Sequence, residues 1–393
     1  MQNAPNFRCP MRLSTVLKRA CALLGVAAMT MTAANAAPAP TFSSTAGVKF
    51  RVTEVATGLA NPWSLAFLPG GDMLVTERPG RLRLIRGGRL EKEPIAGAPK
   101  VAARGQGGLL DVVPHPDFAK NQLLYLSYAA DGEGGVNTEI MRAKLNGNRL
   151  ESPEVIFRAT PKTPGANHYG SRLVFAADGT LFITLGDRFT YRDQAQNTAN
   201  HLGKIVRLRD DGGIPDDNPF KGKADAKPEI FSWGHRNIQG MALRPGTSEM
   251  WAHEHGPRGG DEVNVLKAGA NYGWPKITYG IGYDGAIISD KKELPGMEQP
   301  IVYWVPSIAP SGMAFYDGDK FPQWKGDLFV GALAKTHLRR LKLSGARVTE
   351  QEVLLGELDH RIRDVRSGPD GFLYVVTDDS SNGRVLRLEP AQP

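Results

Sequence analysis

Cysteine is almost absent from the 393-residue chain. Its two cysteines, Cys9 and Cys21, lie within the first 36 residues, a segment with the pattern of a secretory signal. We therefore predict a mature chain without a thiol, a disulfide or a cysteine-ligated metal. Cys21 is a poor candidate for a lipoprotein cysteine, because the residues before it, Lys18-Arg19-Ala20, are not apolar.

Long apolar runs and phosphate-binding loops are also missing. No stretch after residue 36 approaches the ~20 apolar residues that span a bilayer, so we expect no membrane span. The absence of a Gly-rich phosphate loop argues against a nucleotide ligand. Removing the four basic residues of the signal leaves 44 of the 48 basic residues against 41 acidic ones, so the formal charge falls from +7 to +3. That balance, with no run of Lys and Arg interleaved with aromatics, does not favour nucleic acid as a partner.

The signal prediction rests on the order of charge and hydropathy in residues 1 to 36. Arg8, Arg12, Lys18 and Arg19 precede ACALLGVAAMTMTAANA, which ends in the small-x-small site Ala34-Asn35-Ala36. This order is typical of a cleaved signal and predicts a periplasmic or secreted protein whose mature part is residues 37–393, with Met11 as an alternative start. The competing interpretation, a membrane anchor, would need a longer apolar segment.

The rest of the chain repeats one unit: an apolar strand, a Pro/Asp/Gly turn, a second strand and a third segment with alternating apolar residues. The copies begin at SLAFLPGGDMLVTER, GLLDVVPHPDFAKNQLLYLSYA, SRLVFAADGTLFITLGDR, GMALRPGTSEMWAHEH, SGMAFYDGDKFPQWKGDLFVGAL and IRDVRSGPDGFLYVVTDDS. Six such units predict an all-β fold, a six-bladed β-propeller, with residues 50 to 59 as the outer strand of the last blade. The alternatives are a pair of β-sandwiches and a solenoid; uneven repeat spacing argues against the solenoid.

Polar residues recur where the repeats begin and end, which in a propeller is around the central channel. The candidates are Gln106, His168, Arg236, Asn237, Lys335, Arg361 and Arg363. Each alone could be a solvated Arg, a loop Gln or a capped His. Together they predict a basic ring that binds a small polycarboxylate, because Arg binds carboxylates bidentately and stays charged.

A second group of candidates lies in HEHGPRGGDEVNVLKAGANYGWP, residues 253 to 275. Gly256-Pro257 can direct backbone carbonyls to one point, Asp261 can add a carboxylate and Tyr272 another carbonyl. Ca²⁺ takes six to eight such oxygen ligands. A plain turn is the competing interpretation, and His253 with His255 leaves a zinc site as a further alternative. A second calcium site and a plain turn are both open for DDGGIPDDNPF.

These motifs as a set resemble one family. They lie between about residues 50 and 390 and read NPWSLAFLPGG, GQGGLLDV, NHYGSRLVF, LGDR, GHRNIQGMAL, HGPRGGDEVN, ANYGWP and RIRDV. As a set they are similar to the motifs of the PQQ-dependent soluble aldose sugar dehydrogenases, the short bacterial branch of the soluble quinoprotein glucose dehydrogenase family. The resemblance implies a single propeller catalytic domain that oxidises aldoses at C1 to lactones. It also implies pyrroloquinoline quinone (PQQ) as hydride acceptor, Ca²⁺ as Lewis acid and an external electron acceptor.

The resemblance also implies a role for each candidate. It assigns the quinone to Gln106, Arg236, Asn237, Lys335, Arg361 and Arg363, and calcium, in contact with the quinone, to the carbonyls of Gly256 and Pro257. It implies that His168 is the general base and that Asp187 orients the imidazole ring of His168.

The chain also departs from the family pattern. The disulfide and longer loops of the glucose-active members are missing, so glucose preference and their dimer are not implied, and we expect a monomer or weak dimer. Two rival functions are a Ca²⁺-dependent propeller lactonase, which would need carboxylates and Asn around an in-channel calcium, and a non-catalytic sugar-binding propeller, which would have no reason to pair His168 with Asp187.

Overall fold

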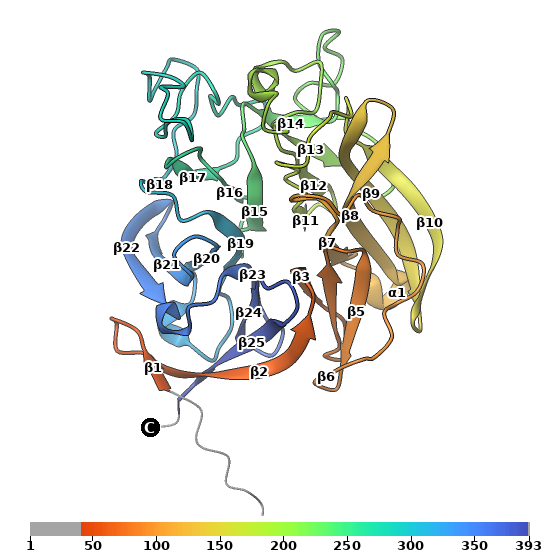
Figure 1. The fold of residues 1–393 in the computed structure, drawn as a ribbon, viewed down its shortest axis with the longest axis vertical. Helices are drawn as coiled ribbons and strands as arrows, with labels where there is room; N and C mark the ends of the chain where they lie inside the picture. The colour runs from red at the N-terminus through yellow and green to blue at the C-terminus, as the bar shows by residue number, and fades with distance from the viewer. Residues whose placement is uncertain (1–40, 392–393) are drawn as a thin grey trace, which may run out of the picture. The chain divides into compact units, whose positions relative to one another are not determined.

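The computed structural model describes residues 41–391 as six antiparallel sheets around a common centre (Figure 1). This arrangement confirms the predicted six-bladed β-propeller. The predicted signal, residues 1 to 36, lies outside the described residues.

The first three blades follow one another along the chain, and each has four strands. The first blade contains β3 (Pro62–Phe67), β4 (Met73–Glu77), β5 (Arg81–Arg86) and β6 (Arg89–Leu90). The second contains β7 (Leu109–Pro114), β8 (Leu123–Gly132), β9 (Gly135–Asn146) and β10 (Arg149–Arg158). The third contains β11 (Leu173–Phe175), β12 (Leu181–Thr184), β13 (Lys204–Leu208) and β14 (Ile230–Trp233).

The last three blades complete the ring. The fourth contains β15 (Ile238–Leu243), β16 (Met250–Glu254), β17 (Asp261–Val265) and β18 (Val302–Trp304). The fifth contains β19 (Pro310–Phe315), β20 (Leu328–Ala332), β21 (His337–Ser344) and β22 (Arg347–Leu354). The sixth has the order β1-β2-β25-β24-β23, from β23 (Ile362–Ser367), β24 (Leu373–Thr377), β25 (Gly383–Pro390), β1 (Thr41–Ser43) and β2 (Lys49–Leu59). The helical turns are α1 (Phe118–Asn121), η1 (Arg192–Gln196), η2 (Pro322–Trp324) and η3 (Gly356–Leu358).

The sixth blade joins the two ends of the described chain. β2 pairs with β25 along most of its length, from Phe50 opposite Pro390 to Leu59 opposite Gly383. This pairing confirms the prediction that residues 50 to 59 supply an outer strand of the last blade. Because strands from both ends share one sheet, the ring cannot open without breaking that sheet.

Each blade buries its faces against its neighbours, as the alternating apolar residues of the repeats predict. Leu74 and Leu84 of the first blade, for example, pack in one cluster with Leu124 and Leu126 of the second. The innermost strands of all six blades surround the centre of the ring (Figure 1).

A buried ion-pair cluster links three of these inner strands. Arg172, just before β11, lies 3.3 Å from Asp111 of β7 and 3.2 Å from Asp364 of β23. Arg366 of β23 lies 3.2 Å from Asp111 and 2.9 Å from Asp364. Two Arg and two Asp side chains balance one another in charge, so the cluster fastens the second, third and sixth blades together at the ring's centre.

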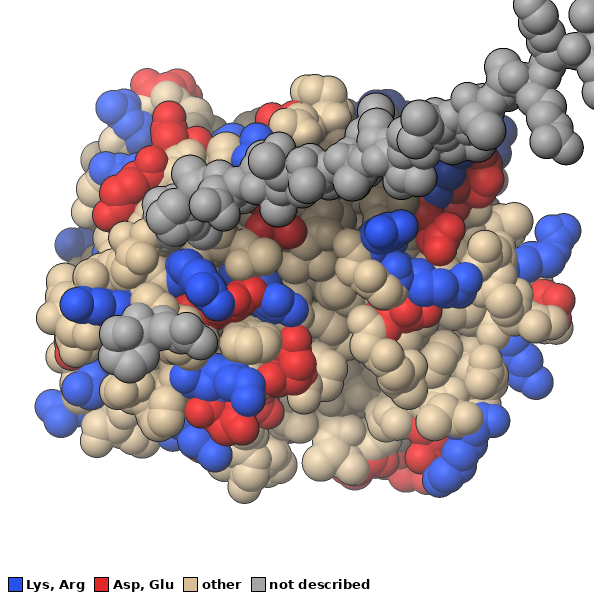
Figure 2. Space-filling view, turned by 90° about the horizontal axis from the view of Figure 1, so that it is seen from below, with Lys and Arg blue, Asp and Glu red and all other residues tan. Residues whose placement is uncertain are grey.

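The surface carries charges of both signs. Figure 2 shows Lys and Arg interspersed with Asp and Glu on the face seen from below, without a region of one sign. Many charged side chains of the described residues are paired, as Arg384 is with Glu54 at 3.2 Å and Arg387 with Glu389 at 2.6 Å. Among residues 41–391, no helix has the length and hydropathy needed to cross a membrane.

Candidate active site

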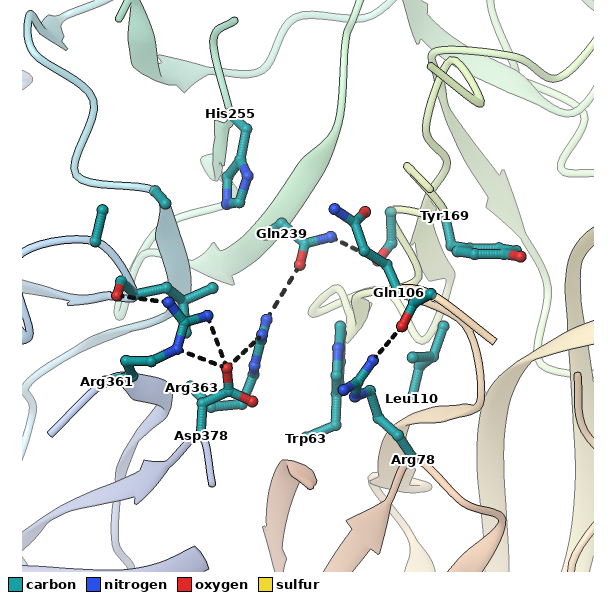
Figure 3. A pocket seen from close by; sticks show the side chains of 15 residues that line it. Trp63, Arg78, Gln106, Leu110, Tyr169, Gln239, His255, Arg361, Arg363 and Asp378 are labelled. Carbon is teal, nitrogen blue, oxygen red and sulfur yellow. Dashed lines mark hydrogen bonds and ion pairs between the residues drawn. The ribbon is translucent and has the colours of Figure 1, made fainter. Parts of the chain in front are cut away.

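A cavity of about 380 Å³ lies at the centre of the ring, between loops of several blades (Figure 3). Its lining is rich in polar and cationic side chains from distant parts of the sequence. The lining residues labelled in Figure 3 are Trp63, Arg78, Gln106, Leu110, Tyr169, Gln239, His255, Arg361, Arg363 and Asp378.

Two of the predicted arginines converge on one carboxylate in this cavity. Arg361 donates to Asp378 Oδ2 from Nε (3.0 Å) and Nη2 (2.9 Å), and Arg363 donates to the same oxygen from Nη2 (3.3 Å) (Figure 3). Burial alone would raise the pKa of Asp378, but the two guanidinium groups outweigh it and hold the pKa below its ordinary value. Asp378 is therefore a carboxylate shared by two cations.

A third arginine, Arg78, lies across the cavity and has no carboxylate partner within residues 41–391. It donates to the carbonyl of Gly105 (2.6 Å) and to Asn61 Oδ1 (3.0 Å), both neutral groups. Three guanidinium groups facing one carboxylate leave a surplus of positive charge. The buried Nε atoms of Arg78 and Arg363 have no hydrogen-bond partner among the described residues. The surplus of positive charge suits an anionic ligand with several acceptor oxygens.

His168 and Asp187 lie beside this cavity and contact each other directly. His168 Nδ1 is 2.7 Å from Asp187 Oδ1, and both side chains are buried. The backbone of His168 has a φ of 55°, in the left-handed region, and its N–H donates to Gln106 Oε1 at 2.8 Å. Among the described residues His168 Nε2 has no hydrogen-bond partner, yet it is not one of the atoms sealed from solvent. The ring can therefore present that nitrogen to a ligand.

The surroundings of His168 favour the neutral imidazole. Burial lowers the pKa of His168 below its ordinary value of 6.5, and Arg236 and Arg188 add to this decrease, while Asp187 opposes it. A neutral ring with Nδ1–H held by a carboxylate has its lone pair on Nε2, which is the arrangement that a general base needs.

Arg236 and Asn237 precede β15 and reach different partners. Arg236 Nη1 donates to the carbonyls of His255 (2.9 Å) and Gly256 (2.6 Å). Asn237 Oδ1 accepts from the backbone N–H of Gly170 (3.2 Å), two residues after His168. Arg236 thus contacts the predicted calcium loop, and Asn237 contacts the loop of the predicted base.

Lys335 stands apart from the other predicted residues. It is exposed and has a φ of 64°; its neighbours Leu333 and Ala334 line the central cavity, but Lys335 itself does not. Of the predicted ring, the described structure brings Gln106, Arg361 and Arg363 into the cavity wall and His168, Arg236 and Asn237 beside it.

The residues predicted to bind calcium fall into two groups. Gly256 and Tyr272 line one small cavity of about 10 Å³ together with Glu254 and Glu262, while Pro257 lines the adjoining groove. The carboxylate of Asp261 is already occupied by hydrogen bonds. It accepts from the backbone N–H groups of Gly256 (2.9 Å), Ile308 (2.7 Å) and Ala309 (3.0 Å).

Glu254 and Glu262 lie directly opposite each other on β16 and β17. Burial and the proximity of Glu254 raise the pKa of Glu262. Sequence reasoning had not identified either glutamate. In the part of the chain that the structure describes, no three His, Cys, Asp or Glu side chains converge as metal ligands, so a calcium site here would depend on backbone carbonyls. His255 Nε2 lies 2.6 Å from the Pro310 carbonyl, which argues against the zinc alternative.

Sequence reasoning also missed Arg78, Trp274 and Asp378. Trp274 donates its indole N–H to Asp187 Oδ2 at 2.8 Å. Arg78 and Asp378 directly follow the second strands of their blades, β4 and β24, as Lys335 follows β20 at a short distance.

The fold and the cavity define a six-bladed propeller with an arginine-rich pocket at its centre and a His–Asp pair beside it. Comparison with known proteins extends this description. The chain belongs to the glucose/sorbosone dehydrogenase family, whose sequence profile matches residues 59–387. This membership confirms the predicted resemblance to sugar dehydrogenases.

Individual relatives agree with the family. The aldose sugar dehydrogenase YliI of Escherichia coli is 48% identical over 338 residues, which cover 84% of this chain and 91% of the relative. The quinoprotein glucose dehydrogenase B of Acinetobacter calcoaceticus is 27% identical over 427 residues, covering 87% and 88%. The PQQ-bound structure of the aldose sugar dehydrogenase of Streptomyces coelicolor superposes with a TM-score of 0.70 at 29% identity, covering 87% of this chain and 99% of that one.

Proposed function

We propose that the protein oxidises aldose sugars at C1 to lactones, with PQQ as the cofactor and Ca²⁺ as a Lewis acid. The observation that carries this proposal is the pairing of His168 with Asp187 (2.7 Å) beside a cavity lined by Arg78, Arg361 and Arg363. A base and an anion site side by side are what the reaction requires. The rival functions would have to account for both features separately.

The central cavity fits the cofactor in charge and chemistry. PQQ is a tricarboxylate, and three guanidinium groups with only one carboxylate among them offset two of its three negative charges. We assign cofactor binding to Gln106, Arg236, Asn237, Lys335, Arg361 and Arg363, and add Arg78. Lys335 would have to swing inward from its exposed position.

His168 is the general base of the proposed reaction. Asp187 holds Nδ1–H, so Nε2 carries the lone pair that takes the proton from the anomeric hydroxyl of the sugar. The lowered pKa of His168 keeps that lone pair free at neutral pH. When bound, PQQ supplies the two-electron acceptor for the hydride of sugar C1, and an external acceptor must then reoxidise it.

Calcium is assigned to the carbonyls of Gly256 and Pro257, with the Tyr272 carbonyl near by. Gly256 O already accepts from Arg236 Nη1 at 2.6 Å, so the ion and the guanidinium group would share this carbonyl or exchange on it. Because the Asp261 carboxylate is occupied by backbone N–H groups, we give it an indirect part, holding Gly256 in place.

The proposed setting is the periplasm or the exterior of the cell, after removal of residues 1 to 36 as a signal. The proposed partners are the aldose and an external electron acceptor, with no nucleic acid partner. We propose a monomer or weak dimer as the working form.

Dye reduction by the purified mature protein tests the function. A panel of aldoses is assayed with and without added PQQ and Ca²⁺. Reduction only when both are present supports the proposal, and the product is then identified as lactone. No reduction, together with an unchanged quinone absorption spectrum on mixing, overturns it and favours a lactonase or a sugar-binding propeller.

A further inference from the structure

Trp274 contacts the His168–Asp187 pair from another blade. It lies in the long loop between β17 and β18 of the fourth blade, whereas His168 and Asp187 flank β11 and β12 of the third. Its indole Nε1 donates to Asp187 Oδ2 at 2.8 Å, and its side chain is buried. The contact therefore crosses between two blades at the edge of the site.

The position of the indole ring is fixed through its own backbone. The N–H of Trp274 donates to the carbonyl of Gly234 (2.9 Å), and its carbonyl accepts from Gln196 Nε2 (2.8 Å). The guanidinium group of Arg236 lies 5.4 Å from the ring centroid, within cation–π range. Arg236 in turn donates to the Gly256 carbonyl, so the ring lies between the predicted base and the predicted calcium loop.

Asp187 is a buried carboxylate whose two oxygens have different partners. Oδ1 accepts from His168 Nδ1 (2.7 Å) and from the backbone N–H of Phe189 (2.8 Å). Oδ2 accepts from Trp274 alone among the described residues. Without the indole N–H, Oδ2 would be left buried and unpaired, and the carboxylate would lose the bond that prevents its rotation.

We propose that Trp274 is a positioning residue: its indole N–H fixes the plane of the Asp187 carboxylate and thereby the ring orientation and tautomer of His168. The inference deepens the proposed function and rests on it for the part that His168 plays in turnover. Its effect is transmitted through Asp187, since Trp274 does not hydrogen-bond to His168.

Two substitutions at Trp274 separate the N–H from the rest of the side chain. Trp274→Phe keeps an aromatic ring but removes the donor. Trp274→His keeps a five-membered ring whose Nε2 can occupy the place of the indole Nε1, and so keeps a donor. The matched control is Trp324→Phe, because Trp324 is also buried but its Nε1 has no hydrogen-bond partner among the described residues.

The first measurement is independent of activity. The imidazole of His168 is titrated by ¹⁵N NMR in the cofactor-free protein and assigned by loss of its signals in His168→Gln. A carboxylate with one donor fewer is more basic and stabilises the imidazolium form, so Trp274→Phe should move the midpoint upward by about half to one pH unit. Trp274→His should restore a midpoint closer to the wild type, and Trp324→Phe should leave it unchanged.

The second measurement is the kinetics of the loaded enzyme. We expect Trp274→Phe to lower kcat about tenfold, with KM within about threefold of wild type, and to move the acid limb of the pH profile in the same direction as the NMR midpoint. Trp324→Phe should leave the pH profile unchanged while it lowers thermal stability.

The outcomes distinguish the two proposals. A folded Trp274→Phe with a wild-type midpoint and kcat overturns the role of Trp274 and leaves the dehydrogenase proposal intact. A wild-type protein that oxidises no aldose with PQQ and Ca²⁺ overturns the function, while the NMR titration still decides the contact. If Trp274→Phe does not fold, Trp274→Leu, which also removes the donor, takes its place; an unmoved midpoint there also overturns the proposal.

Discussion

Acid should destabilise the protein, and His253 should account for a measurable share of that loss. His253 lies on β16 with both ring nitrogens buried and without a partner among the described residues. Burial, with a smaller contribution from Arg172, lowers its pKa from 6.5 to about 3. The folded protein therefore keeps this ring neutral at a pH where the unfolded chain protonates it.

The sign and size follow from linkage. The pKa of this histidine is lower in the folded protein than in the unfolded chain. When the pH falls below the pKa of the unfolded chain, only the unfolded chain takes up the proton, so the free energy of unfolding decreases. At about pH 5, some 1.5 units below 6.5, the loss is about 2 kcal/mol for this one residue, at ~1.4 kcal/mol per unit. The result hardly depends on the folded pKa, provided that it lies well below 5.

Urea unfolding at about pH 7 and pH 5 provides the assay. His253→Met removes the titratable group and fills the space with a flexible side chain. Between the two pH values, the wild type should lose about 2 kcal/mol more stability than the variant. His360→Gln, at a partly exposed position, controls for the loss of a histidine side chain. If wild type and His253→Met lose the same stability within about 0.5 kcal/mol, the folded protein protonates His253 and the reasoning fails.

The remaining predictions concern the site. His168→Gln should bind PQQ as the wild type does, by absorption titration, but lose kcat about 10²- to 10⁴-fold; near-full activity would contradict its role as base. In the wild type, the acid limb of kcat/KM should lie below pH 6.5, because burial lowers the pKa of His168 and only the neutral ring accepts a proton. Asp187→Asn cannot accept from both His168 and Trp274, so kcat should fall about 10²- to 10⁴-fold with a changed His168 tautomer by NMR; an unchanged tautomer argues against this. Arg363→Met should weaken PQQ binding about 10- to 100-fold in titrations of the cofactor-free protein, and an unchanged affinity would remove Arg363 from the cofactor site. Asp261→Asn should raise the calcium concentration for half-maximal activity without changing PQQ affinity, and an unchanged calcium concentration would remove Asp261 from the calcium site.

Much of the fold could be predicted from the sequence because each blade repeats a local pattern. The third strands RLRLIR, KIVRLR, LRRLKL and RVLRLE became β5, β13, β21 and β25, and the N-terminal segment joined the sixth blade as β2. Strand alternation and turn residues are local properties, so they can be read without knowing the neighbours. The added strand β1, three residues long, carries too short a pattern to be predicted.

The site was predictable only where a polar residue interrupts the repeat. His168 and Arg236 stand out because each precedes an apolar strand, and Arg363 because it lies at the start of one. The motifs around all three resemble a known family. Asp378 follows the strand LYVVT and begins a run of turn residues, Asp-Asp-Ser-Ser, so its sequence context is that of an ordinary turn. Its position between Arg361 and Arg363 depends on how the loops of one blade fold toward the centre.

The sequence by itself determined the number of blades, the closing strand and the residue types available around the channel, since these follow from patterns within about forty residues. Only the tertiary structure decided which side chains meet. Trp274 reaches Asp187 across 87 residues of sequence, and Arg363 approaches Gln239 across 124. Such contacts depend on the angles at which neighbouring blades pack, and those angles are set by burial over the whole ring. No local pattern records them.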